Sequence, residues 1–266
     1  MVDMNKLVPL GVGIAAVAVA VLVGGQLIAS SSGGVAAVPS VHPSPSPART
    51  ATTTPTATPV AELSPASIPA DGNMRPGTYV THGWPESDGT LTLTFTVPAG
   101  WHGFGDGTIF PAGEADVPGG GTAFQFIRVA ALNSDLCHWK GPKGEVDVGT
   151  TVDDLVAALA AQTGYEVSDP VDVSIGGYSG KRIDVVYPAG LFKEEDSSEA
   201  PGCDEGVTHL FGDTGIYGQA PNERWQTNIL DVAGTRFVII LQDYPNTSAA
   251  ERAEAATIID SMVIRP

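Results

Sequence analysis

Residues 225–243, WQTNILDVAGTRFVIILQD, decide the fold of the C-terminal part of this chain. Two runs rich in β-branched and aromatic residues, 225–232 and 235–243, predict strands, and the intervening Ala233-Gly234 is typical of a tight hairpin turn. Residues 237–241 are continuously apolar, so both faces of that strand should be covered. We therefore expect this strand near the centre of an antiparallel sheet.

Further strands are predicted on either side of this hairpin. Residues 90–97 alternate between apolar side chains and threonines, which is the pattern of a half-buried strand with one solvated face. Residues 122–130 predict another strand. Residues 171–175 and 178–187 predict a second hairpin that turns at Gly176-Gly177.

Two amphipathic helices complete the expected elements. In residues 151–163 the apolar side chains recur at helical spacing, and Thr151 with Asp154 can form a capping box. Residues 248–262 show the same features, with Ser248 and Glu251 as the capping pair. Antiparallel hairpins combined with two such helices predict an α+β fold, an antiparallel sheet with both helices packed on it in an α/β/α sandwich-like arrangement.

An apolar run precedes this domain. Residues 7–29 contain no charged side chain, and a helix of that length would cover about 35 Å, against about 30 Å of hydrocarbon in a bilayer. We expect a single-pass transmembrane anchor in the cell membrane, with residues 1–6 cytoplasmic and the rest extracytoplasmic, because Lys6 precedes the run and the next cation is Arg49. The alternative is a cleaved signal peptide ending near Val35-Ala36-Ala37, which would give a secreted protein.

Composition divides the rest of the chain into two parts. Residues 30–76 are rich in Ser, Thr, Pro and Ala and bury too little apolar surface to fold, so they predict a disordered stalk. Residues 77–266 hold all four tryptophans and both cysteines and are long enough for one hydrophobic core. The expected organisation is anchor, stalk and one extracytoplasmic domain.

Charge and cysteine content limit the partners and the compartment. The formal net charge of −17 argues against a nucleic-acid partner, because such proteins need basic surfaces. Cys137 and Cys203 are the only thiols, and in an oxidising compartment they are expected to form a disulfide. A redox-active pair lacks the usual C-x-x-C spacing, and two free buried thiols are the third alternative.

The sequence predicts no catalytic residue, no metal site and no cofactor. Its five histidines are scattered, and the acidic stretch 193–205 lacks the spacing of a calcium-binding EF-hand, which favours a solvated loop. Residues 177–181, GYSGK, resemble a nucleophile elbow but lack its final glycine, and residues 103–107, GFGDG, lack the third glycine of a dinucleotide fingerprint. Trp84 and Trp101 could either bind a ligand on loops or cap the ends of the core.

One segment carries a resemblance to known proteins. The domain is similar to extracytoplasmic domains of actinobacterial and Chloroflexi-type membrane-anchored proteins. The features that carry the similarity are residues 93–101 (LTFTVPAGW), the helix at 151–163, the glycines at 176, 177 and 180, and the closing helix. The same features resemble the PsbP-like sandwich, in which helices cover both faces of an antiparallel sheet. The resemblance implies an architecture and brings no catalytic residues.

Two functional hypotheses follow. The first is a membrane-anchored, non-enzymatic binding or interaction domain, whose unknown ligand could be a protein, a cell-wall polymer or a small molecule. The second is a cell-envelope hydrolase that uses acidic residues such as Asp184 or Asp243. The hydrolase requires two carboxylates that converge on one substrate bond.

Overall fold

The computed structural model describes residues 64–84, 91–105, 107–112, 121–140, 144–194, 197–212 and 215–266. By its internal contacts the chain divides into two units, residues 1–58 and 59–266, and every described residue belongs to the second. The apolar run 7–29 and most of the expected stalk therefore lie outside the described residues. Within the described part of the chain, no helix has the length and apolar character needed to cross a membrane.

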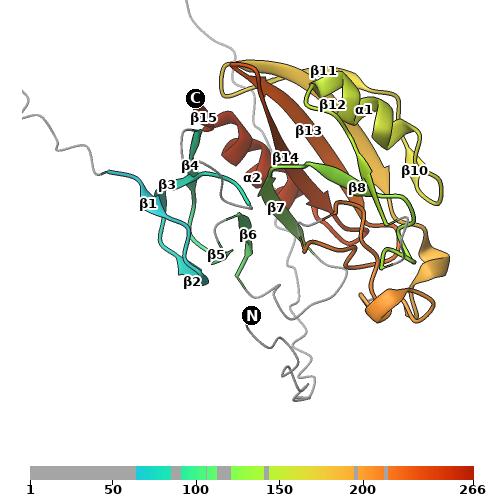
Figure 1. Ribbon diagram of the computed structural model, residues 1–266. Helices are drawn as coiled ribbons and strands as arrows, with labels where there is room; N and C mark the ends of the chain where they lie inside the picture. The colour runs from blue at the N-terminus through green and yellow to red at the C-terminus, as the bar shows by residue number, and fades with distance from the viewer. Residues whose placement is uncertain are drawn as a thin grey trace, which may run out of the picture. The chain divides into compact units, whose positions relative to one another are not determined.

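A nine-stranded antiparallel sheet forms the centre of the domain (Figure 1). Its strands, in spatial order, are β10 (Glu166–Val167), β12 (Tyr178–Val186), β13 (Arg224–Val232), β14 (Thr235–Asp243), β7 (Thr122–Ile127), β6 (Thr108–Pro111), β5 (Trp101–Phe104) and β2 (Asp71–Met74), and β11 (Val171–Ile175) also pairs with β12. The apolar strand β14 lies between β13 and β7, which confirms the predicted interior position.

Smaller elements surround this sheet. A four-stranded sheet has the order β1 (Ala66–Ser67), β3 (Gly77–Thr81), β4 (Thr92–Val97) and β15 (Val263–Arg265). A two-stranded ribbon joins β8 (Ala131–Asn133) and β9 (Glu145–Asp147). The α-helices are α1 (Val152–Ala160) and α2 (Ala249–Asp260), and two 3₁₀ turns, η1 (Ala189–Leu191) and η2 (Asp204–Gly206), follow β12.

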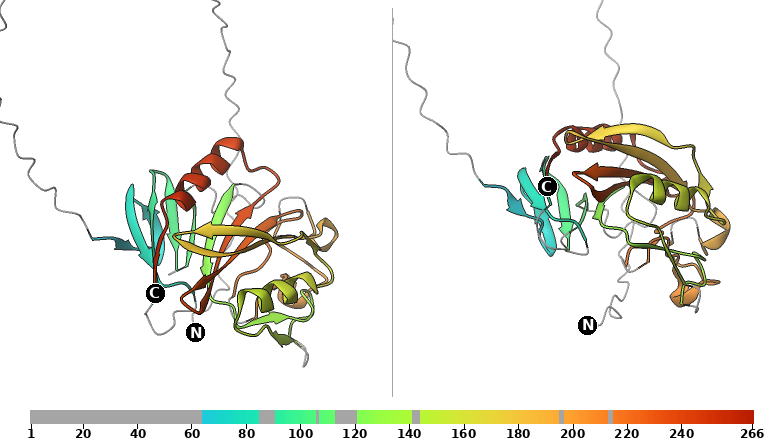
Figure 2. Two further views of the ribbon diagram at one scale, coloured as in Figure 1. Left: turned by 90° about the horizontal axis from the view of Figure 1, so that it is seen from above. Right: turned by 45° about the horizontal axis from the view of Figure 1, so that its top comes forward.

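The large sheet has a hydrophobic core on each face. Alternate side chains of β14 supply both cores: Phe237, Ile239 and Leu241 pack with α2 and the four-stranded sheet, whereas Val238 and Ile240 pack with α1. The two helices consequently lie on opposite sides of the long strands (Figure 2). The predicted α+β class is confirmed, but the layer that contains α2 also contains a second sheet, which the sequence analysis did not anticipate.

Local sequence signals explain the turns and the helix starts. Both residues of each tight turn have positive φ, +59° and +89° at Gly176-Gly177 and +53° and +87° at Ala233-Gly234, as a type I′ hairpin requires. Both predicted capping boxes are present, one before α1 and one before α2. These signals fix the elements that frame the site described below.

The end of the expected stalk differs from the expectation. Residues 66–67 and 71–74 form strands β1 and β2, and Ile68 and Met74 are buried in the core beside α2. The composition of this segment predicted no strand. Pairing with β5 nevertheless satisfies the backbone N–H and C=O groups of β2. Residues ahead of Gly77 therefore already contribute to the folded domain.

Candidate functional site

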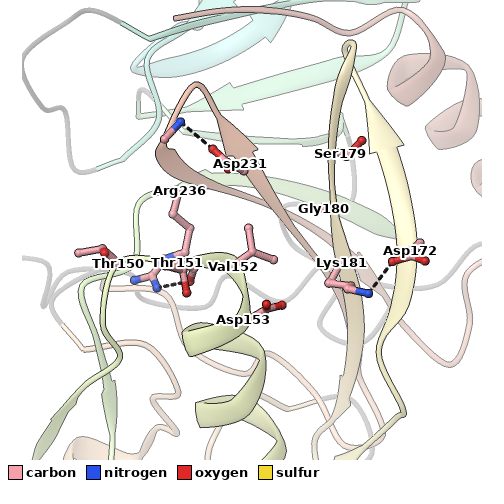
Figure 3. A pocket seen from close by; sticks show the side chains of 11 residues that line it. Thr150, Thr151, Val152, Asp153, Asp172, Ser179, Gly180, Lys181, Asp231 and Arg236 are labelled. Carbon is pink, nitrogen blue, oxygen red and sulfur yellow. Dashed lines mark hydrogen bonds and ion pairs between the residues drawn. The ribbon is translucent and has the colours of Figure 1, made fainter.

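A groove of about 430 Å³ lies between the start of α1, strands β11 and β12, and the β13–β14 turn (Figure 3). Most of the residues that line it are polar or charged, and both signs of charge are present. The residues whose side chains matter for recognition are Asp153, Asp172, Ser179, Lys181, Asp231 and Arg236. This volume falls in the range of pockets that bind small ligands or a few units of a polymer.

Arg236 joins the groove to the core. From β14 its guanidinium donates hydrogen bonds to the carbonyl oxygens of Val148 (3.1 Å), Thr151 (2.9 Å) and Val129 (2.5 Å). Burial lowers the pKa of this half-buried group, an effect that nearby carboxylates oppose. Because the guanidinium satisfies three carbonyls, its role in the groove is to hold the start of α1 against the sheet.

Lys181 and Asp172 form the charged wall opposite Arg236. The Lys181 ammonium donates to the Asp172 carboxylate at 2.5 Å across the β11–β12 hairpin, and this bond raises the pKa of Lys181. Figure 3 shows this pair and, at the far end of the groove, the Asp231 carboxylate, which accepts from the backbone of Gly234 at 2.7 Å. An exposed ion pair of this kind is weak and exchanges readily for a polar ligand.

The start of α1 offers few free donors to an anion. The Asp154 carboxylate accepts from the backbone N–H groups of Thr150 (3.2 Å) and Thr151 (3.0 Å), and these bonds lower the pKa of Asp154. Thr151 in turn accepts from the Asp154 N–H at 3.1 Å. The groove is therefore better suited to a neutral, hydroxyl-rich or mixed-charge ligand than to a phosphate.

The predicted disulfide joins Cys137 to Cys203, which are 66 residues apart in sequence. The two segments also share backbone bonds, from the Asp204 N–H to the Cys137 carbonyl at 2.7 Å and from the His209 N–H to the Leu136 carbonyl at 2.9 Å. Asp135 accepts from the backbone N–H groups of His138 and Cys137, which lower the pKa of its carboxyl. The bridge therefore lies in a well-bonded loop pair at the surface.

The acidic residues proposed for hydrolysis are both paired with arginine. Asp243 is 6% exposed and binds Arg224 and Arg252, the latter at 3.0 Å. Asp184 lies 3.3 Å from Arg182. They occupy β12 and β14, with β13 between them, and neither pairs with the other in a hydrogen bond or ion pair shown by the structure.

Glu223 is an ionisable group that is fully buried, and its sequence neighbours gave no sign of this. Its carboxylate accepts from the indole N–H of Trp225, from Gln242 Nε2 at 2.9 Å, and from the backbone N–H groups of Gln219 (2.6 Å) and Ala220 (3.4 Å). Burial raises the pKa of Glu223 to about 7, although these hydrogen bonds oppose the shift. Every one of these donors is neutral.

The two tryptophans considered as ligand contacts differ. Trp101 is 1% exposed and its indole donates to Glu254 at 2.5 Å, so it belongs to the core. Trp84 is 44% exposed. Its backbone N–H donates to the Phe126 carbonyl of β7, and its carbonyl accepts from the Arg128 N–H. Trp84 is therefore partly exposed at the surface, whereas Trp101 is buried.

The remaining sequence motifs have structural explanations where they are described. Residues 177–181 are the last residue of the turn and the start of β12, where Gly180 is required because a Cβ atom would overlap the backbone of Ile229. In the stretch 193–205, Lys193 pairs with Glu199 at 2.9 Å, while Glu195 and Asp196 lie outside the described residues. Across the described ranges no three His, Cys, Asp or Glu side chains gather as metal ligands would.

Comparisons with known proteins give a likeness among solved structures. No family model matches the chain, and no curated protein matches it. Among solved structures it is similar to LpqN of Mycobacterium tuberculosis, described as involved in cell envelope biogenesis. The likeness has a TM-score of 0.38 at 16% identity and covers 71% of this chain and 92% of that one.

Proposed function

We propose that this protein is a membrane-anchored, extracytoplasmic binding domain that recognises a hydroxyl-rich component of the cell envelope without catalysis. The groove beside α1 carries the proposal, because it combines a ligand-sized volume with the exchangeable Lys181–Asp172 pair and a rigid support in Arg236. The Cys137–Cys203 disulfide supports a location in an oxidising compartment. The apolar run 7–29 is the proposed anchor, and residues from Ser30 to the first strand are the proposed spacer.

A polysaccharide is the partner class that the groove suits best. Carboxylates at Asp153, Asp172 and Asp231 accept hydrogen bonds from hydroxyls, while Lys181 donates to ring or amide oxygens. The strong negative charge of the chain disfavours anionic polymers such as nucleic acids. A neutral glycan with amide substituents fits both observations.

Binding to purified cell-wall sacculi tests this proposal. We expect the domain to co-sediment with sacculi, and we expect Lys181→Ala and Ser179→Trp to weaken binding at least tenfold, because the first removes a donor and the second fills the groove from an exposed position. Lys193→Ala is the matched control, because it removes another exposed ion pair that lies outside the groove. If all four proteins bind equally, the groove is not the binding site. If the unmodified domain does not co-sediment with sacculi, the ligand is not the cell-wall polysaccharide.

A further inference from the structure

A chain of four polar side chains crosses the face of the large sheet that packs with α1. Glu223 accepts from Gln242 Nε2 at 2.9 Å, Gln242 Oε1 accepts from Gln125 Nε2 at 3.3 Å, and Gln125 Oε1 accepts from the Thr108 hydroxyl at 2.5 Å. Gln242 is 2% exposed and Gln125 is 7% exposed, whereas Thr108 is half-buried. The chain thus connects a fully buried carboxyl group to the hydroxyl of the half-buried Thr108 on β6.

All hydrogen bonds in this chain point toward Glu223. That direction suits a carboxylate, which only accepts. A protonated carboxyl group must instead donate; the backbone N–H groups of Gln219 and Ala220 and the Trp225 indole cannot receive its proton, whereas the Tyr244 hydroxyl, which also hydrogen-bonds Glu223, and the Gln242 amide can. Gln242 can receive it, because a half-turn of its terminal amide exchanges Nε2 for Oε1 and leaves the heavy atoms in nearly the same places.

The same half-turn propagates along the chain. Once Gln242 presents its oxygen to Glu223, its nitrogen faces Gln125, whose amide must then turn to present an oxygen. The nitrogen of Gln125 consequently faces Thr108, and the threonine hydroxyl accepts instead of donating. Its hydrogen is then free to point toward solvent.

We propose that Glu223, Gln242, Gln125 and Thr108 form a reversible hydrogen-bond chain that converts the Thr108 hydroxyl from a surface acceptor into a surface donor when Glu223 takes up a proton. The affected surface lies on the β5–β6 hairpin, where Thr108 pairs across the strands with Phe104, which is 52% exposed. A ligand that contacts this hairpin would therefore meet a hydrogen-bond acceptor when Glu223 is ionised and a donor when Glu223 is protonated. This device is independent of the groove beside α1.

The surroundings allow this transition to occur near neutral pH. The titratable groups that face Glu223 are Tyr187 of β12, Tyr165 ahead of it in sequence and Tyr244 after β14, and burial raises the pKa of Tyr187 and Tyr165, so both stay neutral. The charged residues nearest in sequence are Arg224 and Asp243. They form an ion pair with each other, and strand alternation places their side chains on the face of the sheet opposite to Glu223. Burial also raises the pKa of Glu223 itself to about 7.

Side-chain NMR of the whole folded domain tests the chain. Across pH 5 to 9 we expect the Glu223 carboxyl carbon and the side-chain amide signals of Gln242 and Gln125 to shift with one common midpoint. In Gln242→Met the Glu223 signal should still titrate while the Gln125 amide no longer responds. Gln226→Met, on the opposite face of β13, is the matched control and should leave the coupled response intact.

Two results would overturn the proposal. One is a Gln125 amide that stays constant while Glu223 titrates in the unmodified protein. The other is a Gln125 response that persists with an unchanged midpoint in a folded Gln242→Met variant. If Gln242→Met fails to fold, Gln125→Met provides the second test: the Gln242 amide should still shift with the Glu223 signal, and a Gln242 amide that stays constant there would overturn the proposal.

Discussion

Replacing Glu223 with alanine is expected to lower the free energy of unfolding by about 4 kcal/mol or more. The substitution leaves the Trp225 indole, the Gln242 amide and the N–H groups of Gln219 and Ala220 without their acceptor, and each buried unsatisfied donor costs about 1–3 kcal/mol. Urea unfolding of the oxidised domain measures the change. A loss below about 1 kcal/mol would show that water or a rearranged segment replaces the carboxylate.

Glu254→Ala is the matched control for this experiment. Glu254 also accepts from a tryptophan indole, that of Trp101 at 2.5 Å, but its side chain lies on the exposed side of α2. Solvent can replace the lost acceptor there, so we expect a loss below about 1 kcal/mol. Comparable losses in the two variants would mean that the indole bond, and not the buried network, accounts for the effect.

The same buried carboxyl group predicts how stability depends on pH. Its pKa is raised to about 7 in the folded protein from 4.5, so the folded state binds the proton more tightly than the unfolded state. This contribution is fully present below pH 4.5 and is lost as the pH rises through about 7, for a total of roughly 3 kcal/mol. Unfolding curves between pH 4 and 8 should show this decline, and Glu223→Gln should abolish it.

Removing the disulfide is the second large effect that we expect. Cys137→Ser with Cys203→Ser should lower the free energy of unfolding by about 2–5 kcal/mol, because the bridge closes a long loop and restricts the unfolded chain. The unmodified domain unfolded in the presence of reductant is the control and should match the double variant. Equal stability of the oxidised domain and the double variant would contradict a structural role for the bridge.

Sequence reasoning succeeded where a feature depends on neighbours in the chain. The two type I′ turns and the two capping boxes are local patterns. The interior position of β14 followed from its unbroken apolar run. The spatial order of β7, β6, β5 and β2 has no such local signal, because it depends on pairing between distant segments, and the second sheet was missed for the same reason.

Glu223 shows why the ionisable site was harder to predict than the fold. Between Asn222 and Arg224 it resembles an ordinary exposed residue ahead of a strand. Its burial depends on Tyr187 of β12, Gln242 of β14 and the turn at Gln219, which only the tertiary fold brings together. One usable signal existed: the turn at 233–234 sets the register that pairs Trp225 with Gln242, a polar residue at the end of an apolar strand.

The proposed function requires that the domain folds outside the cytoplasm. The most direct measurement is to denature the protein straight from the cells that make it and to treat it with a maleimide polymer, with and without prior reduction. We expect no labelled cysteine before reduction and two after it, because Cys137 and Cys203 are paired in an oxidising compartment. Two labelled cysteines before reduction would place the domain in a reducing compartment and contradict the account.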